Sequence, residues 1–410
     1  MIKRAFLHIG GEKTGTTTLQ NFLTRNAALL EKAGFYYPCG ADEICFENNA
    51  HFPVAASVLT SAVEFVSVER YRTLSSVLPH LTQMCRIAEG TLILSCEHLS
   101  SRLDHLWQIR KLRDALPTDD IKIVFYAREP SELALASWST GIRCGNNLRF
   151  DANRIVPQIR YFNHVQTLDL WAEVFGESNL IVREYGRTQL VGGDIRQDFC
   201  KQLGVEVTNP LLDDDRNISL DLQRLEVLRH INEGLPQFDQ CADGWRRAQS
   251  IRREIIEFIP EGKPLVELLS RHDTNAIKAR FSEVTRELNG RYFGGRLSRK
   301  WFSEDFPEEP IANSPATLQD AEVIRVLVDT ITRIAEKMNQ YETLIGVQRS
   351  RRISSRLKKR LRSLKQRLKY PLGAMKRRVL APHRRASVPS TEAFGRGTLN
   401  RARSLTRDAE

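Results

Sequence analysis

The chain has few of the features that mark membrane, secreted or metal-binding proteins. No apolar run approaches the roughly 18 to 20 residues that a membrane span needs, and no signal-peptide pattern precedes the first apolar segment. Seven cysteines among 410 residues are scattered without C-x-x-C spacing, which argues against a disulfide framework and a zinc site. We therefore expect a cytoplasmic protein with reduced thiols and no bound metal.

The positive charge is confined to one end of the chain. The formal net charge is +11, but residues 349–410 hold 20 Lys and Arg against 3 acidic residues. Residues 1–348 consequently carry a net charge of −6. The main body is mildly acidic, so a surface that binds polyanions need not lie on it.

Residues 349–369 have the pattern of a cationic amphipathic helix. Its apolar residues recur at intervals of 4, 4, 3 and 4, at Ile353, Leu357, Leu361, Leu364 and Leu368. Such a helix can lie on an anionic membrane surface, which would hold the protein at the inner membrane face. An anionic polysaccharide or nucleic acid is an alternative ligand, with nucleic acid the less favoured. A solvated tail is the other alternative, and it fits best beyond Pro371.

Short apolar runs alternate with helical patterns along most of the chain. The runs predict buried parallel strands at residues 5–9, 91–96, 121–126 and 180–182, with a further short strand at 35–37. Helices are predicted at residues 19–33, 53–88, 103–115, 131–143, 157–176, 194–203, 219–233 and 276–288. This alternation predicts an α/β fold with a P-loop-like central parallel sheet flanked by helices.

The first strand leads into a glycine-rich turn and then a helix, in the order His8-Ile9-Gly10-Gly11-Glu12-Lys13-Thr14-Gly15-Thr16-Thr17-Thr18. Such a turn points backbone N–H groups and a helix N-terminus at one spot, which suits a phosphate or a sulfate. The nucleoside-triphosphate loop places its Lys after the second Gly. Here Lys13 precedes Gly15, which argues against ATP or GTP. An ordinary strand-to-helix turn is the remaining alternative.

At these residues the chain resembles the sulfotransferases that use 3′-phosphoadenosine-5′-phosphosulfate (PAPS), in particular bacterial and carbohydrate-type members. Their phosphosulfate loop has the form K-[ST]-G-T-[ST] directly after the first strand, and residues 13–17 match it position for position. The resemblance extends over roughly residues 1–300. It implies that the donor's phosphosulfate is held by Lys13, Thr14, Gly15, Thr16, Thr17 and Thr18, and that no metal is needed.

A second strand ends in Tyr126-Ala127-Arg128-Glu129-Pro130 and is followed by a helix. In the sulfotransferase pattern, an Arg at this strand end and a Ser eight residues later hold the donor's 3′-phosphate. Arg128 matches, and a guanidinium with a hydroxyl is a sound phosphate grip. Position 136 is Ala, so the resemblance assigns the hydroxyl to Ser137, one residue later. A surface ion pair is the alternative role of Arg128.

The strand at 91–96 delivers Glu97 and His98 to the carboxyl edge of the same sheet, where open α/β sheets bind ligands. Transfer to an alcohol needs a base for the hydroxyl proton and a cation at the leaving oxygen. Glu97 or His98 could be the base and Lys13 the cation. The resemblance to carbohydrate-type members favours Glu97. The alternative is that Glu97 caps a helix and His98 is solvated.

Together these patterns predict a PAPS-dependent sulfotransferase domain over residues 1–300. Within it, about 205–260 is expected to form an insertion on the acceptor side, followed by a linker and helix at 301–348 and the tail. The expected acceptor is a hydroxyl of a carbohydrate or glycolipid. Two other functions stay open, a nucleotide-dependent phosphotransferase and a catalytically silent binding or scaffold protein with a membrane-associating tail.

Overall fold

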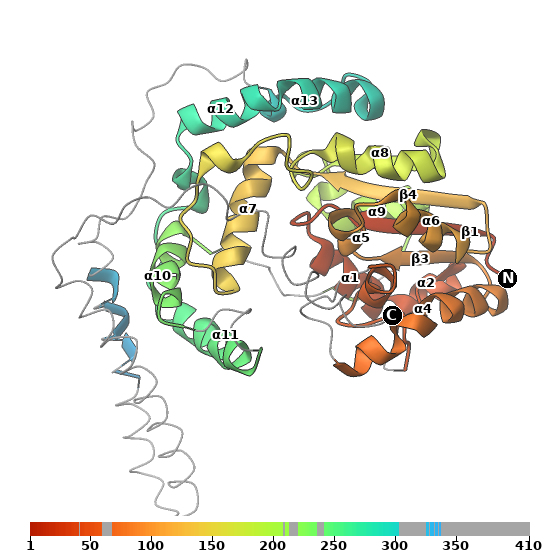
Figure 1. The fold of residues 1–410 in the computed structure, drawn as a ribbon, viewed down its shortest axis with the longest axis horizontal. Helices are drawn as coiled ribbons and strands as arrows, with labels where there is room; N and C mark the ends of the chain where they lie inside the picture. Colours follow the sequence, from red (N-terminus) through yellow and green to blue (C-terminus); the bar gives the residue numbers. More distant parts are fainter. Residues whose placement is uncertain are drawn as a thin grey trace, which may run out of the picture. The chain divides into compact units, whose positions relative to one another are not determined.

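The computed structural model describes residues 1–40, 42–59, 68–207, 210–212, 220–235, 242–302 and parts of 325–337. Five parallel strands form one sheet in the order β2-β3-β1-β4-β5 (Figure 1). Their bounds are β1 Arg4–Gly10, β2 Phe35–Tyr36, β3 Thr91–Ser95, β4 Asp120–Ala127 and β5 Leu180–Glu184. The predicted α/β fold with a parallel sheet is confirmed, and each predicted strand is present within two residues of its expected ends.

Helices cover both faces of the sheet because each central strand buries both of its sides. Leu7 and Ile9 of β1 lie in one apolar cluster, and Phe6 lies in the other, as the alternation of a strand requires. The first cluster is covered by α3 (Phe52–Ala56), α4 (Val68–Ile87), α5 (His98–Arg102), α6 (Leu106–Asp114) and α8 (His164–Phe175). The second is covered by α1 (Thr16–Arg25), α2 (Ala27–Lys32) and α9 (Ile195–Leu203).

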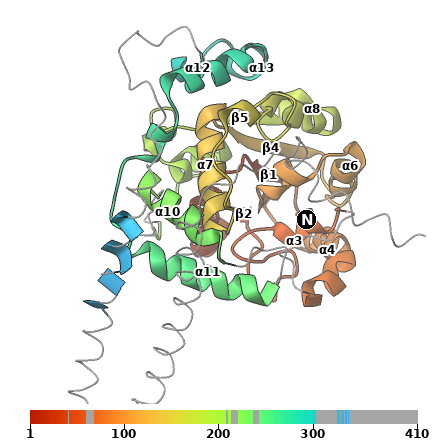
Figure 2. The same cartoon turned by 60° about the vertical axis from the view of Figure 1, so that its left-hand side comes forward.

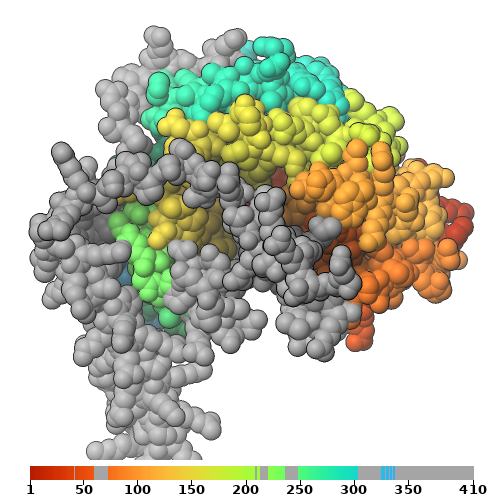
Figure 3. All heavy atoms as spheres, viewed as in Figure 1, coloured from red at the N-terminus to blue at the C-terminus, as the bar shows by residue number. Residues whose placement is uncertain are grey.

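A second group of helices extends from the carboxyl edge of the sheet (Figures 1 and 2). It begins with α7, Pro130–Arg143, whose side chains pack on those of the later helices. Its other members are α10 (Leu222–Asn232), α11 (Ala242–Ile256), α12 (Arg271–Arg280) and α13 (Ser282–Leu288). Figure 3 shows α12 and α13 in teal against α7 and α8 in yellow. Residues 205–260, expected to be an insertion, thus contribute α10 and α11 to this group.

Three helices that the apolar pattern predicts as continuous are interrupted. The 53–88 segment contains α3 and α4, with non-helical residues at 57–59 after α3. The 19–33 helix breaks at Asn26, whose side-chain Nδ2 donates to the carbonyls of Phe22 and Leu211, and whose side-chain Oδ1 accepts from Leu211 N–H. The 276–288 helix breaks at Phe281, which is buried among the side chains of α7 and α12. At Asn26 and Phe281 the side chain of the residue at the break makes a tertiary contact, with Leu211 and with α7 respectively.

Only part of the expected C-terminal helix lies within the described residues. The described positions of 325–337 are helical, and Val326 and Thr330 are buried. The Lys337 ammonium lies 4.9 Å from the ring centre of Phe258, just beyond α11. The link at 304–315 and the tail at 349–410 lie outside the described residues, so their roles stay predictions. Among the helices that the structure describes, none is long and apolar enough to cross a membrane.

The end of β1 fits between its two neighbours only because two glycines stand there. A Cβ on Gly10 would lie 2.8 Å from Cβ of Glu97, which follows β3. A Cβ on Gly11 would lie 2.3 Å from the carbonyl oxygen of Tyr126 on β4. Gly10 also has φ of 75°, a conformation that other residues rarely adopt. The glycines of the predicted turn therefore set how closely three strand ends approach.

We expect Gly11→Ala to lower the free energy of unfolding by about 1–3 kcal/mol, because the added methyl must displace backbone rather than a flexible side chain. Gly290→Ala is the matched control, since Gly290 is exposed and nothing lies within 4 Å of its added Cβ. It should leave stability unchanged or raise it by less than about 1 kcal/mol. Urea denaturation of the three proteins measures both effects. Equal stability of Gly11→Ala and wild type would contradict the close packing of β1 on β4.

Candidate functional site

The loop between β1 and α1 holds an open helix N-terminus toward a large cleft. Lys13 and Gly15 both have left-handed backbones, with φ of 64° and 76°. Gly15 is the N-cap of α1, and no side chain caps the first turn. The N–H groups of that turn, together with the positive end of the helix dipole, are thus left for a ligand. A left-handed Lys is strained by about 1 kcal/mol or more, which is common at ligand-binding loops.

The threonines of the loop have two different roles. Thr14 is fully buried, and its hydroxyl donates to the carbonyl of Gly11 at 2.5 Å, so it stabilises the loop from within. Thr16, Thr17 and Thr18 line the cleft together with Lys13 and Gly15. The structure therefore gathers the predicted loop residues at one site, with the Thr14 hydroxyl directed into the loop rather than toward a ligand.

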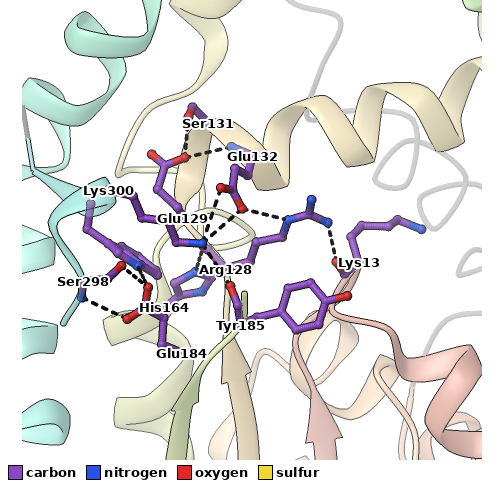
Figure 4. A network of polar contacts seen from close by, with 11 residues as sticks. Lys13, Arg128, Glu129, Ser131, Glu132, His164, Glu184, Tyr185, Ser298 and Lys300 are labelled. Carbon is purple, nitrogen blue, oxygen red and sulfur yellow. Dashed lines mark hydrogen bonds and ion pairs between the residues drawn. The ribbon is translucent and has the colours of Figure 1, made fainter. Parts of the chain in front are cut away.

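Arg128 joins the end of β4 to this loop. Its Nη1 donates to the carbonyl oxygen of Lys13 at 2.6 Å, and its Nε lies 3.5 Å from a carboxylate oxygen of Glu132 (Figure 4). The guanidinium carbon lies 5.5 Å from the ring centre of Tyr185, which follows β5. The carbonyl of Arg128 accepts from His164 Nε2 at 2.7 Å. Both ends of Arg128 are thus fixed, while its side chain stays partly exposed in the cleft.

Ser137, the predicted hydroxyl partner of Arg128, does not line this cleft. Along α7 the lining residues include Ala136, Ser139 and Thr140, which recur at the spacing of one helix face. Ser137 instead interacts with the hydroxyl of Tyr161, which also donates to Glu12. The role of Ser137 at a 3′-phosphate stays a prediction, and Ser139 and Thr140 are the hydroxyls that the helix presents to the cleft.

Glu97 and His98 stand at the end of β3, beside the loop, and both line the cleft. One carboxylate oxygen of Glu97 accepts from Gln20 Nε2 at 2.8 Å, and Gln20 is buried in the second turn of α1. Glu97 is the N-cap residue of α5 but its side chain makes no cap hydrogen bond. Glu97 is thus the cap of α5 by position, while its carboxylate contacts Gln20 rather than the helix N–H groups. Among the described residues, this is the hydrogen bond that the carboxylate makes.

His98 is largely buried among groups of both charges. Burial lowers its pKa from 6.5, the carboxylates of Glu97 and Glu12 oppose this, and the positive charges of Arg102 and Lys13 add to it. Its Nδ1 lies 3.8 Å from a carboxylate oxygen of Glu12, and its ring packs edge-on against Phe52. A neutral imidazole in this position can accept a proton, so both candidate bases remain next to the loop.

The cleft has a volume of about 1970 Å³, larger than the roughly 300–1,000 Å³ of most sites for one small molecule. One wall is the carboxyl edge of the sheet with the loop and Arg128. The other wall consists of α7, α11 and residues 265–266. A donor and an acceptor can therefore be accommodated together.

Lys300 is a cleft residue that the sequence patterns did not indicate. Its ammonium donates to the carbonyl of Tyr185 at 3.1 Å and lies 3.4 Å from both carboxylate oxygens of Glu132. The segment that carries it is held by buried Glu184, which accepts from the N–H and hydroxyl of Ser298 and from the indole N–H of Trp301. A glutamate at the end of a strand, directly after Arg183, was the available signal for such a buried anchor.

One group of residues outside the cleft has the composition of a metal site. The ligand atoms of Glu43, Cys45 and His80 lie within 4.8 Å of one another, among the described residues. His80 Nε2 is 3.0 Å from Glu43 Oε1, which also accepts from the N–H of Cys45 at 2.9 Å. The ion pair between His80 and Glu43, and the hydrogen bond from the Cys45 backbone to Glu43, explain why the three side chains lie together. The expectation of a protein without a metal stays a prediction.

Comparisons with known proteins return few matches. No family model matches the chain. An uncharacterized protein of Archaeoglobus fulgidus is 28% identical over 189 residues, which are 46% of this chain and 50% of that protein. The chain thus spans half the length of this relative. The crystal structure of a sulfotransferase from Alicyclobacillus acidocaldarius is 17% identical, with a TM-score of 0.32 over 60% of this chain and 100% of that one. The functional argument therefore rests on the residues of the cleft.

His164, which supports Arg128, should make stability depend on pH. Burial lowers its pKa from 6.5 to about 4, so the unfolded chain binds a proton that the folded chain refuses. Stability due to this group is present above pH 6.5 and is lost as pH falls toward 4. His164→Gln keeps an N–H donor without a titrating ring. We expect it to reduce the slope of unfolding free energy in this range by about 1.4 kcal/mol per pH unit.

Urea denaturation at pH 7, 6 and 5 measures these slopes. His105→Gln is the control, because the side chain of His105 is well exposed, and its profile should match that of wild type. Parallel profiles for wild type and His164→Gln would show that His164 gains its proton in the folded protein as readily as in the unfolded chain.

Proposed function

We propose that the protein is a sulfotransferase that moves a sulfuryl group from PAPS to a hydroxyl. The observation that carries the proposal is the hydrogen bond between Arg128 and the carbonyl of Lys13. It places a guanidinium beside an uncapped helix N-terminus, so two anion-binding groups open into one cleft. A donor with a 5′-phosphosulfate and a 3′-phosphate on one ribose needs two such groups close together.

In this proposal each group has a separate task. The N–H groups of residues 15–18 bind the phosphosulfate, and the Lys13 ammonium neutralises charge on the oxygen that leaves sulfur. Arg128 binds the 3′-phosphate, with hydroxyls of α7 as further donors. Glu97 takes the proton of the attacking hydroxyl, while Gln20 fixes its orientation. The hydroxyl oxygen forms the new bond to sulfur, and 3′-phosphoadenosine-5′-phosphate leaves.

The acceptor is proposed to be a carbohydrate or a glycolipid. The openness of the cleft supports an extended acceptor, since 1970 Å³ exceeds the needs of a nucleotide alone. If residues 349–369 bind an anionic membrane surface as their pattern predicts, a glycolipid on the inner face would lie within reach.

Donor binding distinguishes this function from a phosphotransferase. Calorimetry should show that the wild-type protein binds 3′-phosphoadenosine-5′-phosphate at least about tenfold more tightly than AMP or ATP. Arg128→Ala should weaken the bisphosphate by about 10- to 100-fold, the value of a charge-assisted contact, and weaken AMP by less, because AMP loses only the support that Arg128 gives the loop. Arg86→Ala, an exposed site on α4, is the control and should change nothing. Tight binding of ATP with no response to the bisphosphate would refute the proposal.

Transfer of radiolabelled sulfate from PAPS to extracted glycans and lipid-linked sugars tests the base. Glu97→Gln keeps the shape and the contact with Gln20 but removes the base, so transfer should fall by about 10²- to 10⁴-fold. Binding of the bisphosphate should be unchanged. His98→Gln should have the smaller effect. Full transfer by Glu97→Gln together with loss in His98→Gln would assign the base to His98 instead.

A further inference from the structure

The two walls of the cleft differ in charge. Among the described residues that line it, three cations lie on the wall formed by the end of α7 and by α11, namely Arg143, Arg252 and Arg253. No described acidic residue lines that wall. This excess of positive charge is notable in a body whose residues 1–348 carry a net charge of −6.

Every described carboxylate of the cleft lies on the opposite wall or at the start of α7, and each already has a partner. Glu97 accepts from Gln20, Glu132 pairs with Arg128 and Lys300, and Asp194 pairs with Arg196. Glu12 accepts from the hydroxyl of Tyr161 and lies close to His98. Among the described residues, the cations of the sheet wall are thus largely balanced, while Arg143 and Arg253 lie on a part of the helical wall that no acidic residue lines.

The helical wall is held rigidly by Arg252. This side chain is fully buried, and its Nε donates to Asn232 Oδ1 at 2.8 Å. The amide of Asn232 in turn donates to the carbonyls of Ile142 and Asn146, at 2.8 and 2.7 Å. Gly145 leaves the space that the guanidinium fills, since a Cβ there would lie 2.7 Å from Nη2. α10, α11 and the end of α7 are therefore fixed to one another.

Arg143 and Arg253 are exposed at this fixed wall. Arg143 is the last residue of α7, whereas Arg128 lies two residues before its first. A helix of 14 residues is about 20 Å long. One ribose carries both the 5′-phosphosulfate and the 3′-phosphate of the proposed donor. The loop at Lys13 and the guanidinium of Arg128, which a hydrogen bond joins, are the proposed binding groups for the two. An anion that binds near Arg143, about 20 Å from Arg128, would therefore belong to the acceptor and not to the donor.

We propose that Arg143 and Arg253 bind an anionic group of the acceptor, so that the acceptor is a hydroxyl compound bearing a carboxylate, phosphate or sulfate. This rests on the proposed transferase function. Arg252 acts as a positioning residue, because its guanidinium is committed to the helix contacts. The reacting hydroxyl lies at Glu97, and the anion is held on the opposite wall, which orients an extended acceptor across the loop.

The test uses two disaccharides with one skeleton, neutral cellobiose and cellobiouronic acid, which carries one carboxylate. Each is titrated into the full chain saturated with 3′-phosphoadenosine-5′-phosphate. Wild type should bind the acid at least tenfold more tightly than the neutral sugar. Arg143→Ser/Arg253→Ser should lose this preference and keep its affinity for the bisphosphate.

Lys32→Ser/Arg86→Ser is the matched control, because it removes two exposed charges from α2 and α4, away from the cleft. It should keep the preference. The charge of the tail is the same in all three proteins and cancels in the comparison. Equal binding of the two disaccharides by wild type, or no binding of the acid, overturns the inference.

Survival of the preference in Arg143→Ser/Arg253→Ser also overturns it. If that variant instead loses affinity for the bisphosphate, the two arginines belong to the donor site. Failure of wild type to bind the bisphosphate at all would count against the transferase function itself, so the two failures are distinguishable.

Discussion

The contact between the Arg128 guanidinium and the Lys13 carbonyl is the constraint on which the site depends. Lys13 ends a loop that has to turn back from β1 into α1, and its left-handed backbone would be unfavourable without external support. Arg128 provides that support from β4. The same side chain that faces the cleft as a cation therefore also holds the loop in the shape that exposes its N–H groups.

The groups beneath Arg128 support this arrangement through hydrogen bonds. His164 donates to the Arg128 carbonyl as a neutral ring, because burial makes its charged form costly. Glu129 caps α7 through the N–H of Glu132, and burial raises its pKa. Glu184 fixes the segment that brings Lys300 into the cleft. The layer below the cleft thus consists of buried side chains that hydrogen-bond the segments above them.

The sequence was sufficient for the order of strands and helices along the chain, because apolar runs and helical periods are local signals. The loop at residues 13–18 and Arg128 were also found locally, since each follows directly after a buried strand. Helix breaks at Asn26 and Phe281 were missed because they depend on contacts with Leu211 and with α7. Ser137 shows the limit of counting along a helix, since one residue changes the face by about 100°. Lys300 and Gln20 had no motif, and only the fold brings them to the cleft.

The buried guanidinium of Arg252 has a consequence for how such a fold can diversify. It fixes the helical wall to α10 and α7 through Asn232. The start of α7 contacts the donor side through Glu132, which pairs with Arg128 and Lys300, whereas α11 and the end of α7 lie across the cleft. Exposed residues on α11 can be exchanged without disturbing the strand ends that hold the donor. A descendant of this chain could therefore bind a different acceptor while it keeps the same donor.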